Sequence, residues 1–178
     1  MSAETDDERI SAGIRAVLDR AVRRLSEAGA RDEALATFVE PRRVLLFTKD
    51  ATMVPIGRVW RLGVLLLDRS GGLYATGSIT RAVEPGRAAY QSLSAEGRRE
   101  YRAAAFRGPF DRGETVNFDA RAIPLAPDEL RSSTGPLFLR GDRPMVRWNT
   151  SPGDDAAVDL DAYLADRVEL LIHPPEGA

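Results

Sequence analysis

The most apolar run of the chain reads Trp60-Arg61-Leu62-Gly63-Val64-Leu65-Leu66-Leu67-Asp68. A run of this length cannot cross a bilayer, because a transmembrane helix takes about 20 apolar residues. The pattern predicts a buried strand rather than a helix, because Gly63 lies inside the run and turn-forming residues 69–72 follow it. Residues 73–81 then alternate between apolar and polar side chains, which is typical of a half-buried antiparallel strand. The two segments predict a hairpin around which the core assembles.

Two helical segments are predicted before this hairpin. Apolar residues recur at helical spacing from Asp7 to Ala28, and Gly29 suits the left-handed position after a helix end. A second, short helix is predicted from Asp32 to Val39. We therefore expect a disordered tail over residues 1–6 and a helical N-terminal segment over residues 7–40.

The remaining segments are short strands and two amphipathic helices. Strands are predicted at residues 44–47, 115–123, 137–140 and 145–148. One helix is predicted from Ser94 to the stop at Gly108, a single helical turn from Pro127 to Arg131, and a last helix from a cap at Asp159 or Asp161 to Pro174.

This order of elements predicts an α+β fold. We expect a strongly curved antiparallel sheet or a small partial barrel of about six or seven strands, with N-terminal, central and C-terminal helices. Strands followed by a terminal helix also resemble the pleckstrin-homology-like arrangement, a small barrel with one end covered by a helix. One domain is predicted over residues 1–178, with the α+β core at residues 43–172.

The composition limits the partners and the compartment. The chain is 43% hydrophobic and 29% charged, and its net charge of -2 with interspersed acids and bases predicts no general affinity for nucleic acid or an anionic membrane. There is no cysteine, which excludes disulfides and thiolate chemistry. The first eight residues are acidic and polar, unlike a secretory signal, so we expect a cytoplasmic protein.

The common catalytic and cofactor motifs are missing from the sequence. Lys49 is the only lysine and His173 the only histidine, and neither G-x-x-x-x-G-K-[ST], G-x-G-x-x-G, H-E-x-x-H nor G-x-S-x-G occurs. The aspartates at 154, 155, 159 and 161 lack the spacing of a calcium loop. We expect no cofactor and no metal site, and no pair of the 27 acidic residues is singled out as catalytic.

The predicted central helix is rich in arginine. Arg98, Arg99 and Arg102 could together bind phosphates, or they could form local ion pairs with Glu96 and Glu100. The net charge favours the second interpretation, a solvated helix face.

Two sets of residues are candidates for binding. If the strands at 74–80 and 115–121 share a sheet, their polar faces form a platform that can orient a polar ligand, although such a face can equally be the wet side of the sheet. This platform consists of Thr76, Ser78, Asn117, Asp119 and Arg121. Trp60, Trp148 and Arg147 are of residue types that dominate protein interfaces, although tryptophan is also ordinary core material.

Several phrases resemble a family of small uncharacterised actinobacterial proteins. These are residues 39–44, 60–67, 74–77, 135–137 and the ending 174–178. Members of that family are sometimes named glutaminase, but the serine-dependent glutaminases use S-x-x-K and resemble β-lactamases. Here the residue three before Lys49 is Leu46, so that mechanism is closed to this chain.

The leading functional hypothesis is a non-enzymatic cytoplasmic domain that binds a partner protein or a small ligand through its sheet or helix surface. The alternative is a small amidohydrolase, glutaminase-like by family name only, which uses carboxylates and hydroxyls. An exposed apolar patch holding Trp60 or Trp148 would favour binding. A deep pocket in which Asn117, Asp119 and Arg121 converge would favour the enzyme. The sequence specifies neither the ligand nor the oligomeric state.

Overall fold

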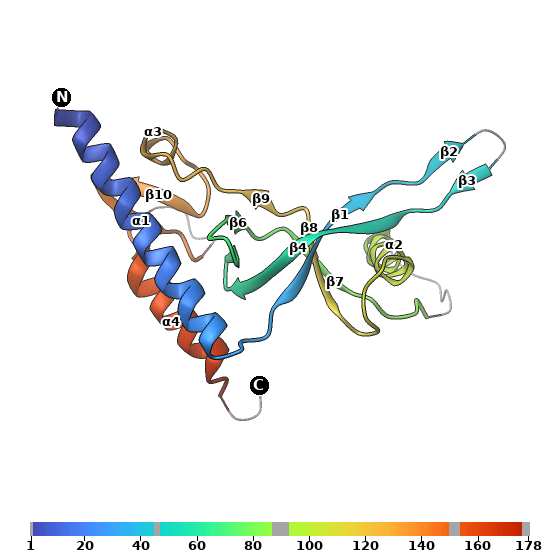
Figure 1. Ribbon diagram of the computed structural model, residues 1–178. Coiled ribbons are helices and arrows are strands. Elements are labelled where there is room, and N and C mark those ends of the chain that lie inside the picture. Colours follow the sequence, from blue (N-terminus) through green and yellow to red (C-terminus); the bar gives the residue numbers. More distant parts are fainter. Residues whose placement is uncertain (1, 45–46, 87–92, 150–153, 176–178) are drawn as a thin grey trace. The chain divides into compact units, whose positions relative to one another are not determined.

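The computed structural model describes residues 2–44, 47–86, 93–149 and 154–175, and it contains two compact units (Figure 1). The first unit comprises residues 1–31, 60–75 and 121–178, and the second comprises residues 32–59 and 76–120. Each unit has a buried apolar cluster of its own. The single domain that we expected, with its core at residues 43–172, stays a prediction, and each unit is described by itself. No described helix is long and apolar enough to cross a membrane.

The first unit contains three helices and most of the short strands. The helices are α1 (Ser2–Glu27), α3 (Pro127–Arg131) and α4 (Leu160–Ile172). The strands are the end of β4 (Thr52–Leu62), β5 (Leu65–Asp68), β6 (Leu73–Ala75), β9 (Arg121–Ala122), β10 (Leu137–Arg140), β11 (Arg143–Val146) and β12 (Val158–Asp159). They form ladders in the orders β4-β5-β6-β9 and β10-β11-β12.

Helices α1 and α4 lie side by side in the first unit (Figure 1). The apolar stripe of α1, which includes Ile14 and Leu25, is buried in the same cluster as Leu164 of α4. Two ion pairs join their solvent sides, Arg20 to Asp161 at 2.5 Å and Arg24 to Glu169 at 2.7 Å. Both predicted amphipathic helices are therefore confirmed, and α1 begins at Ser2, so that residues 2–6 are helical instead of forming a disordered tail.

The apolar run that was expected to be one strand is a tight hairpin. β4 ends at Leu62, residues 63–64 form a turn, and β5 begins at Leu65. Gly63 adopts φ 65°, a left-handed conformation that glycine enters without steric cost. The Tyr163 hydroxyl of α4 accepts a hydrogen bond from the Val64 amide and donates one to the Leu62 carbonyl, both at 3.0 Å. The run therefore reverses direction while its leucines stay buried.

The turn after β5 is organised by one carboxylate. Asp68 accepts hydrogen bonds from the amides of Ser70 and Gly72, each at 2.8 Å, and from the hydroxyls of Ser70 and Tyr74 at 2.7 and 3.1 Å. Burial raises the pKa of Asp68, but the hydrogen bonds from Ser70, Gly72 and Tyr74 outweigh it and hold the pKa below its ordinary value.

Replacing Asp68 by asparagine is expected to destabilise the first unit by about 1–2 kcal/mol at neutral pH, because an amide cannot accept all of these hydrogen bonds. A carboxyl whose pKa is lowered by folding stabilises the native state above its unfolded pKa, and this contribution is lost as the pH falls through the folded pKa. The difference between wild type and Asp68→Asn, measured by urea unfolding, should therefore shrink between pH 6 and the acid range. Exposed Asp142→Asn is the control, and a difference that is constant with pH would contradict the assignment.

The second unit is a sheet covered on one face by a helix. Its strands are β1 (Glu33–Val39), β2 (Arg42–Val44), β3 (Phe47–Lys49), residues 52–59 of β4, β7 (Ser78–Arg81) and β8 (Thr115–Phe118), and its helix is α2 (Leu93–Arg107). The strand order is β7-β8-β1-β4, in which β1 and β8 are parallel, whereas β1 and β4, and β7 and β8, are antiparallel. Ala104 and Ala105 of α2 lie in one buried cluster with Val116 and Phe118 of β8.

The short helix predicted from Asp32 to Val39 is wrong, because this segment is strand β1. It pairs with β4 along one edge and with β8 along the other. Pairing on both edges satisfies the backbone without a helix, and tertiary pairing of this kind overrides local propensity. The strand predicted at 44–47 is also different, since residues 42–44 and 47–49 pair as a hairpin and residues 45–46 lie outside the described part.

The α+β class and the N-terminal, central and C-terminal helices are confirmed. Strand β4 belongs to both units, so the ladder order is β7-β8-β1-β4-β5-β6-β9. It is mixed rather than purely antiparallel, because β1 and β8 are parallel. The described strands do not close into a barrel, so the pleckstrin-homology-like likeness is wrong, whereas the partial barrel stays a prediction. The strong curvature of the sheet stays a prediction.

Candidate functional site

The second unit contains a pocket of about 420 Å³ beside β7 and α2. This volume lies within the range of roughly 300–1,000 Å³ that small-molecule sites occupy. We call it the arginine pocket, and it is lined by Glu33, Ile79, Thr80, Arg81, Val83, Arg98, Tyr101, Arg102 and Thr115.

Helix α2 places three of these side chains on one face. Arg98, Tyr101 and Arg102 are three and four residues apart, which is the spacing of neighbours on a helix surface. The Tyr101 ring meets the Phe38 ring edge-on, with centroids 5.1 Å apart, and lies 4.7 Å from the Phe118 ring. The aromatic contacts fix this face of α2 against the sheet, so the two guanidinium groups are held at the pocket.

The sheet supplies a row of three polar residues from three strands. Arg81 of β7 lies opposite Thr115 of β8 in the antiparallel register. Ala34 of β1 lies beside Val116 of β8 in the parallel register, so Glu33 is beside Thr115. Side chains at neighbouring positions across a sheet lie on the same face. A carboxylate, a hydroxyl and a guanidinium group therefore follow one another across β1, β8 and β7.

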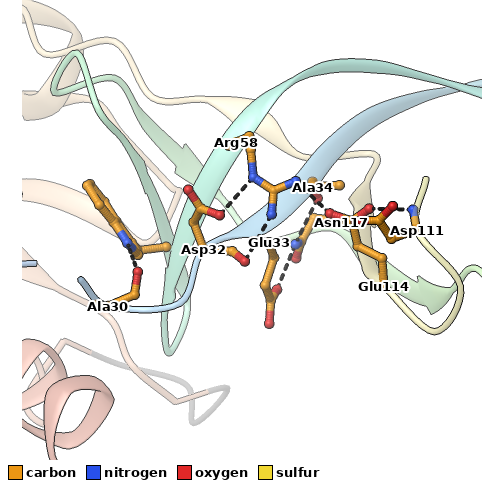
Figure 2. Close-up of polar contacts among 9 residues, drawn as sticks. Ala30, Asp32, Glu33, Ala34, Arg58, Asp111, Glu114 and Asn117 are labelled. Atoms are coloured by element: carbon orange, nitrogen blue, oxygen red, sulfur yellow. Dashed lines mark hydrogen bonds and ion pairs between the residues drawn. The ribbon is translucent and has the colours of Figure 1, made fainter. Parts of the chain in front are cut away.

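Asn117 fixes the orientation of the carboxylate in this row (Figure 2). Its side chain is 1% exposed, and its Nδ2 donates to Glu33 Oε2 at 2.7 Å and to the Ala34 carbonyl at 3.2 Å. A buried amide is costly unless it is hydrogen-bonded, so these bonds fix the amide and the carboxylate together. The fold thus directs a buried polar group at a residue of the pocket wall.

The charges of the pocket are unbalanced. Three guanidinium groups and one carboxylate leave a formal charge of +2 among the lining residues. No described residue forms an ion pair with Arg81, Arg98 or Arg102. The local ion pairs expected between the arginines of α2 and Glu96 or Glu100 are not formed among the described residues, and Arg99 instead donates to the Gly86 carbonyl at 3.2 Å.

In contrast to the three arginines of the pocket, Arg58 forms ion pairs with carboxylates of the protein (Figure 2). Its Nε is 2.7 Å from Asp32 Oδ1, and its Nη1 is 2.5 Å from Glu114 Oε1. Glu114 Oε2 also accepts from the Asp111 amide at 3.0 Å. The hydrogen bond to Glu114, followed by that to Asp32, raises the pKa of Arg58 despite its burial. The network joins β4 to the residues just before β1 and β8, where the pocket residues Glu33 and Thr115 begin.

The polar platform predicted from the sequence does not form one face. Ser78 lies opposite Phe118, whereas Asn117 lies opposite Ile79, so Ser78 and Asn117 are on opposite faces of the sheet. Thr76 lies between β6 and β7 and is half-buried, and Asp119, with φ 56°, is exposed after the end of β8. Arg121 belongs to β9 of the first unit. None of the five lines the arginine pocket, although Asn117 contacts Glu33.

The residues predicted for a protein interface have different environments. Trp60 is 1% exposed and its Nε1 donates to the Ala30 carbonyl at 3.0 Å, so it is a core residue of the first unit. Arg147 is held by Asp154 and by the carbonyls of Ser133 and Gly135. Trp148 is 45% exposed, with Nε1 donating to the Ala156 carbonyl at 2.7 Å. Of the three, only Trp148 presents a large surface to solvent.

Sequence reasoning identified Arg98 and Arg102 but missed the residues that the sheet adds to them. The sequence pattern predicts a helix over the segment that contains Glu33, and Arg81 is the last residue of an edge strand, so the sequence marks neither of them as a site residue. Within the described ranges, no group of three or more acidic or histidine side chains is placed to hold a metal ion.

The fold and the site together define this molecule as an α+β chain with an arginine-lined pocket. The chain matches no family model, and neither curated proteins nor solved structures give a match. The resemblance to small actinobacterial proteins therefore stays a prediction.

Proposed function

We propose that this chain is a non-enzymatic cytoplasmic binding protein whose second unit holds a small anionic ligand in the arginine pocket. One observation carries the proposal. Three guanidinium groups line a pocket of about 420 Å³ and have no ion-pair partner among the described residues. Guanidinium groups offer fixed, forked donors that match the oxygens of phosphates and carboxylates.

A small ligand fits these observations better than a protein partner. The pocket is concave and combines a few polar groups with Tyr101, Ile79 and Val83, as ligand sites do. Of the two tryptophans around which an apolar patch for a protein partner was expected, Trp60 is buried and Trp148 is 45% exposed. The amidohydrolase alternative required Asn117, Asp119 and Arg121 to converge on a pocket, and none of them lines this one. No observation therefore favours the enzyme.

The proposal is tested by calorimetric titration with inorganic phosphate, small phosphate monoesters and dicarboxylates at low salt. The variant is Arg98→Gln/Arg102→Gln, which removes two cations while keeping the helix formers of α2. The double variant is expected to weaken anion binding by about 100-fold or more, since two cations are removed and each charge-assisted hydrogen bond to an ion contributes about 1.5–3 kcal/mol. Binding by the wild type should also weaken with added salt.

Arg23→Gln is the matched control, because Arg23 is exposed on α1 of the first unit and outside the pocket. It should bind anions as the wild type does. The proposal is wrong if no anion binds the wild type, or if the control and the double variant lose affinity equally.

A further inference from the structure

We infer that the ligand of the arginine pocket is a short acidic peptide, held in an extended conformation along the outer edge of β7 with its carboxylates on Arg81, Arg98 and Arg102. This inference rests on the proposed function and names the chemical class of the small anion. It follows from the course of the pocket around β7, from the backbone groups at the outer edge of that strand and from the cations on both sides of the edge.

The pocket passes around β7 instead of lying on one face of the sheet. Thr80 lies opposite Val116, which is buried with Ala104 of α2, so Thr80 is on the face that α2 covers. Ile79 and Arg81 are on the other face, because successive side chains of a strand alternate. All three residues of β7 line the pocket. The pocket therefore extends along the outer edge of this strand.

The outer edge of β7 offers backbone hydrogen-bonding groups. β7 is the first strand of its ladder, so β8 pairs with one edge and no described strand pairs with the other. The Ala82 amide donates to the Glu114 carbonyl at 2.9 Å, and residues of an antiparallel strand bond a given neighbour at every second position. Thr80 therefore bonds β8, whereas the amides of Ile79 and Arg81 point away from it. An extended peptide satisfies such groups as an added strand, about 4.8 Å from β7.

The cations beside this edge select an acidic peptide. Arg98 and Arg102 line the pocket from α2, Arg81 lies on the opposite face, and none of the three has an ion-pair partner among the described residues. The side chains of an added strand alternate between the two faces, so two adjacent acids reach both sets of guanidinium groups. Ile79 is 52% exposed beside Arg81, and an apolar residue next to the acids covers it.

The test is calorimetric titration of the whole chain with three probes. The first is the acetylated and amidated hexapeptide Thr-Val-Glu-Glu-Val-Thr, which reads the same in both directions and so suits a parallel or an antiparallel partner. The second is the same peptide with its valine and glutamate amides N-methylated, and the third is a single capped glutamate. The wild type is expected to bind the first at least about tenfold more tightly than the others, because each net hydrogen bond contributes roughly fivefold and several are lost.

Ile79→Pro tests the edge from the side of the protein. Proline removes the outward amide and keeps the bonds to β8, and edge strands tolerate it. It should weaken hexapeptide binding about tenfold and leave the capped glutamate unchanged. Ile79→Ala is the matched control, because it loses the same side chain but keeps the amide, and it should bind the hexapeptide within about threefold of the wild type.

The outcomes separate this inference from the proposed function. If the N-methylated peptide binds as tightly as the hexapeptide, and Arg98→Gln/Arg102→Gln weakens both, the anion site stands and the pairing with β7 is wrong. If neither the peptides nor phosphate and dicarboxylates bind, both proposals fail. If Ile79→Pro lowers the melting temperature, the comparison of the two peptides on the wild type still decides the question, because it needs no variant.

Discussion

Replacing Gly63 by alanine will destabilise the first unit by about 3 kcal/mol or more. Gly63 has φ 65°, where a Cβ is strained, and a Cβ built there would overlap the Tyr163 hydroxyl. That hydroxyl cannot retreat freely, because it bonds both the Val64 amide and the Leu62 carbonyl, each at 3.0 Å. Only a few mechanisms make a single substitution strongly destabilising, and backbone strain and steric overlap in the core are two of them. Urea unfolding followed by tryptophan fluorescence measures the effect, because both tryptophans lie in the first unit.

The double variant separates the overlap from the backbone strain. Tyr163→Phe alone should cost about 1–3 kcal/mol, because it leaves a buried carbonyl and amide without their partner. In Gly63→Ala/Tyr163→Phe the overlap is removed, so the combined loss should be clearly smaller than the sum of the single losses. Additive losses would show that the Tyr163 hydroxyl does not determine the turn.

Replacing Arg147 by alanine is expected to cost about 2–3 kcal/mol, although the sequence marked this residue for an interface. Its Nη1 donates to the carbonyls of Ser133 and Gly135 at 3.1 and 2.7 Å, and its guanidinium carbon lies 3.7 Å from the centroid of the Phe138 ring. Removing the side chain leaves these carbonyls unsatisfied and removes the cation–π contact. The same fluorescence-detected unfolding measures the loss.

Arg143→Ala is the matched control for Arg147→Ala. The side chain of Arg143 is 69% exposed and its ion pair with Asp159 spans 3.6 Å, so the loss of unfolding free energy in Arg143→Ala should be below about 0.5 kcal/mol. The hydrogen bond from Arg147 also lowers the pKa of Asp154. The ion pair between Arg147 and Asp154 therefore stabilises the native state at pH values above the ordinary pKa of a carboxyl group, and this stabilisation is lost as the pH falls. Equal effects of the two substitutions would contradict a structural role for Arg147.

A functional consequence follows from the different positions of these residues. Gly63, Tyr163 and Arg147 belong to the first unit, whereas the arginine pocket belongs to the second. Substitutions in the arginine pocket should therefore change anion binding, whereas substitutions of Gly63, Tyr163 or Arg147 should change the free energy of unfolding. Measuring both properties on all variants tests whether the two roles are carried by separate residues.

The helices and the class of fold could be predicted from the sequence alone. The stripe of α1, the cap of α4 at Asp159 and the arginine-rich face of α2 are local patterns, and a helix satisfies its backbone within itself. Two of the residues of the arginine pocket, Arg98 and Arg102, were visible for the same reason. The absence of cysteine and of the common catalytic motifs was likewise a property of the sequence.

The strands and the complete pocket were decided only by tertiary structure. Residues 33–39 form a strand because β4 and β8 pair with both of its edges, and no local pattern records those partners. The apolar run turns at Gly63 because Tyr163, a hundred residues away in the chain, bonds both sides of the turn. Glu33, Arg81 and Thr115 meet only through the register of three strands. Strand partners and faces depend on contacts between distant segments, and a shift of one residue reverses the face of every side chain.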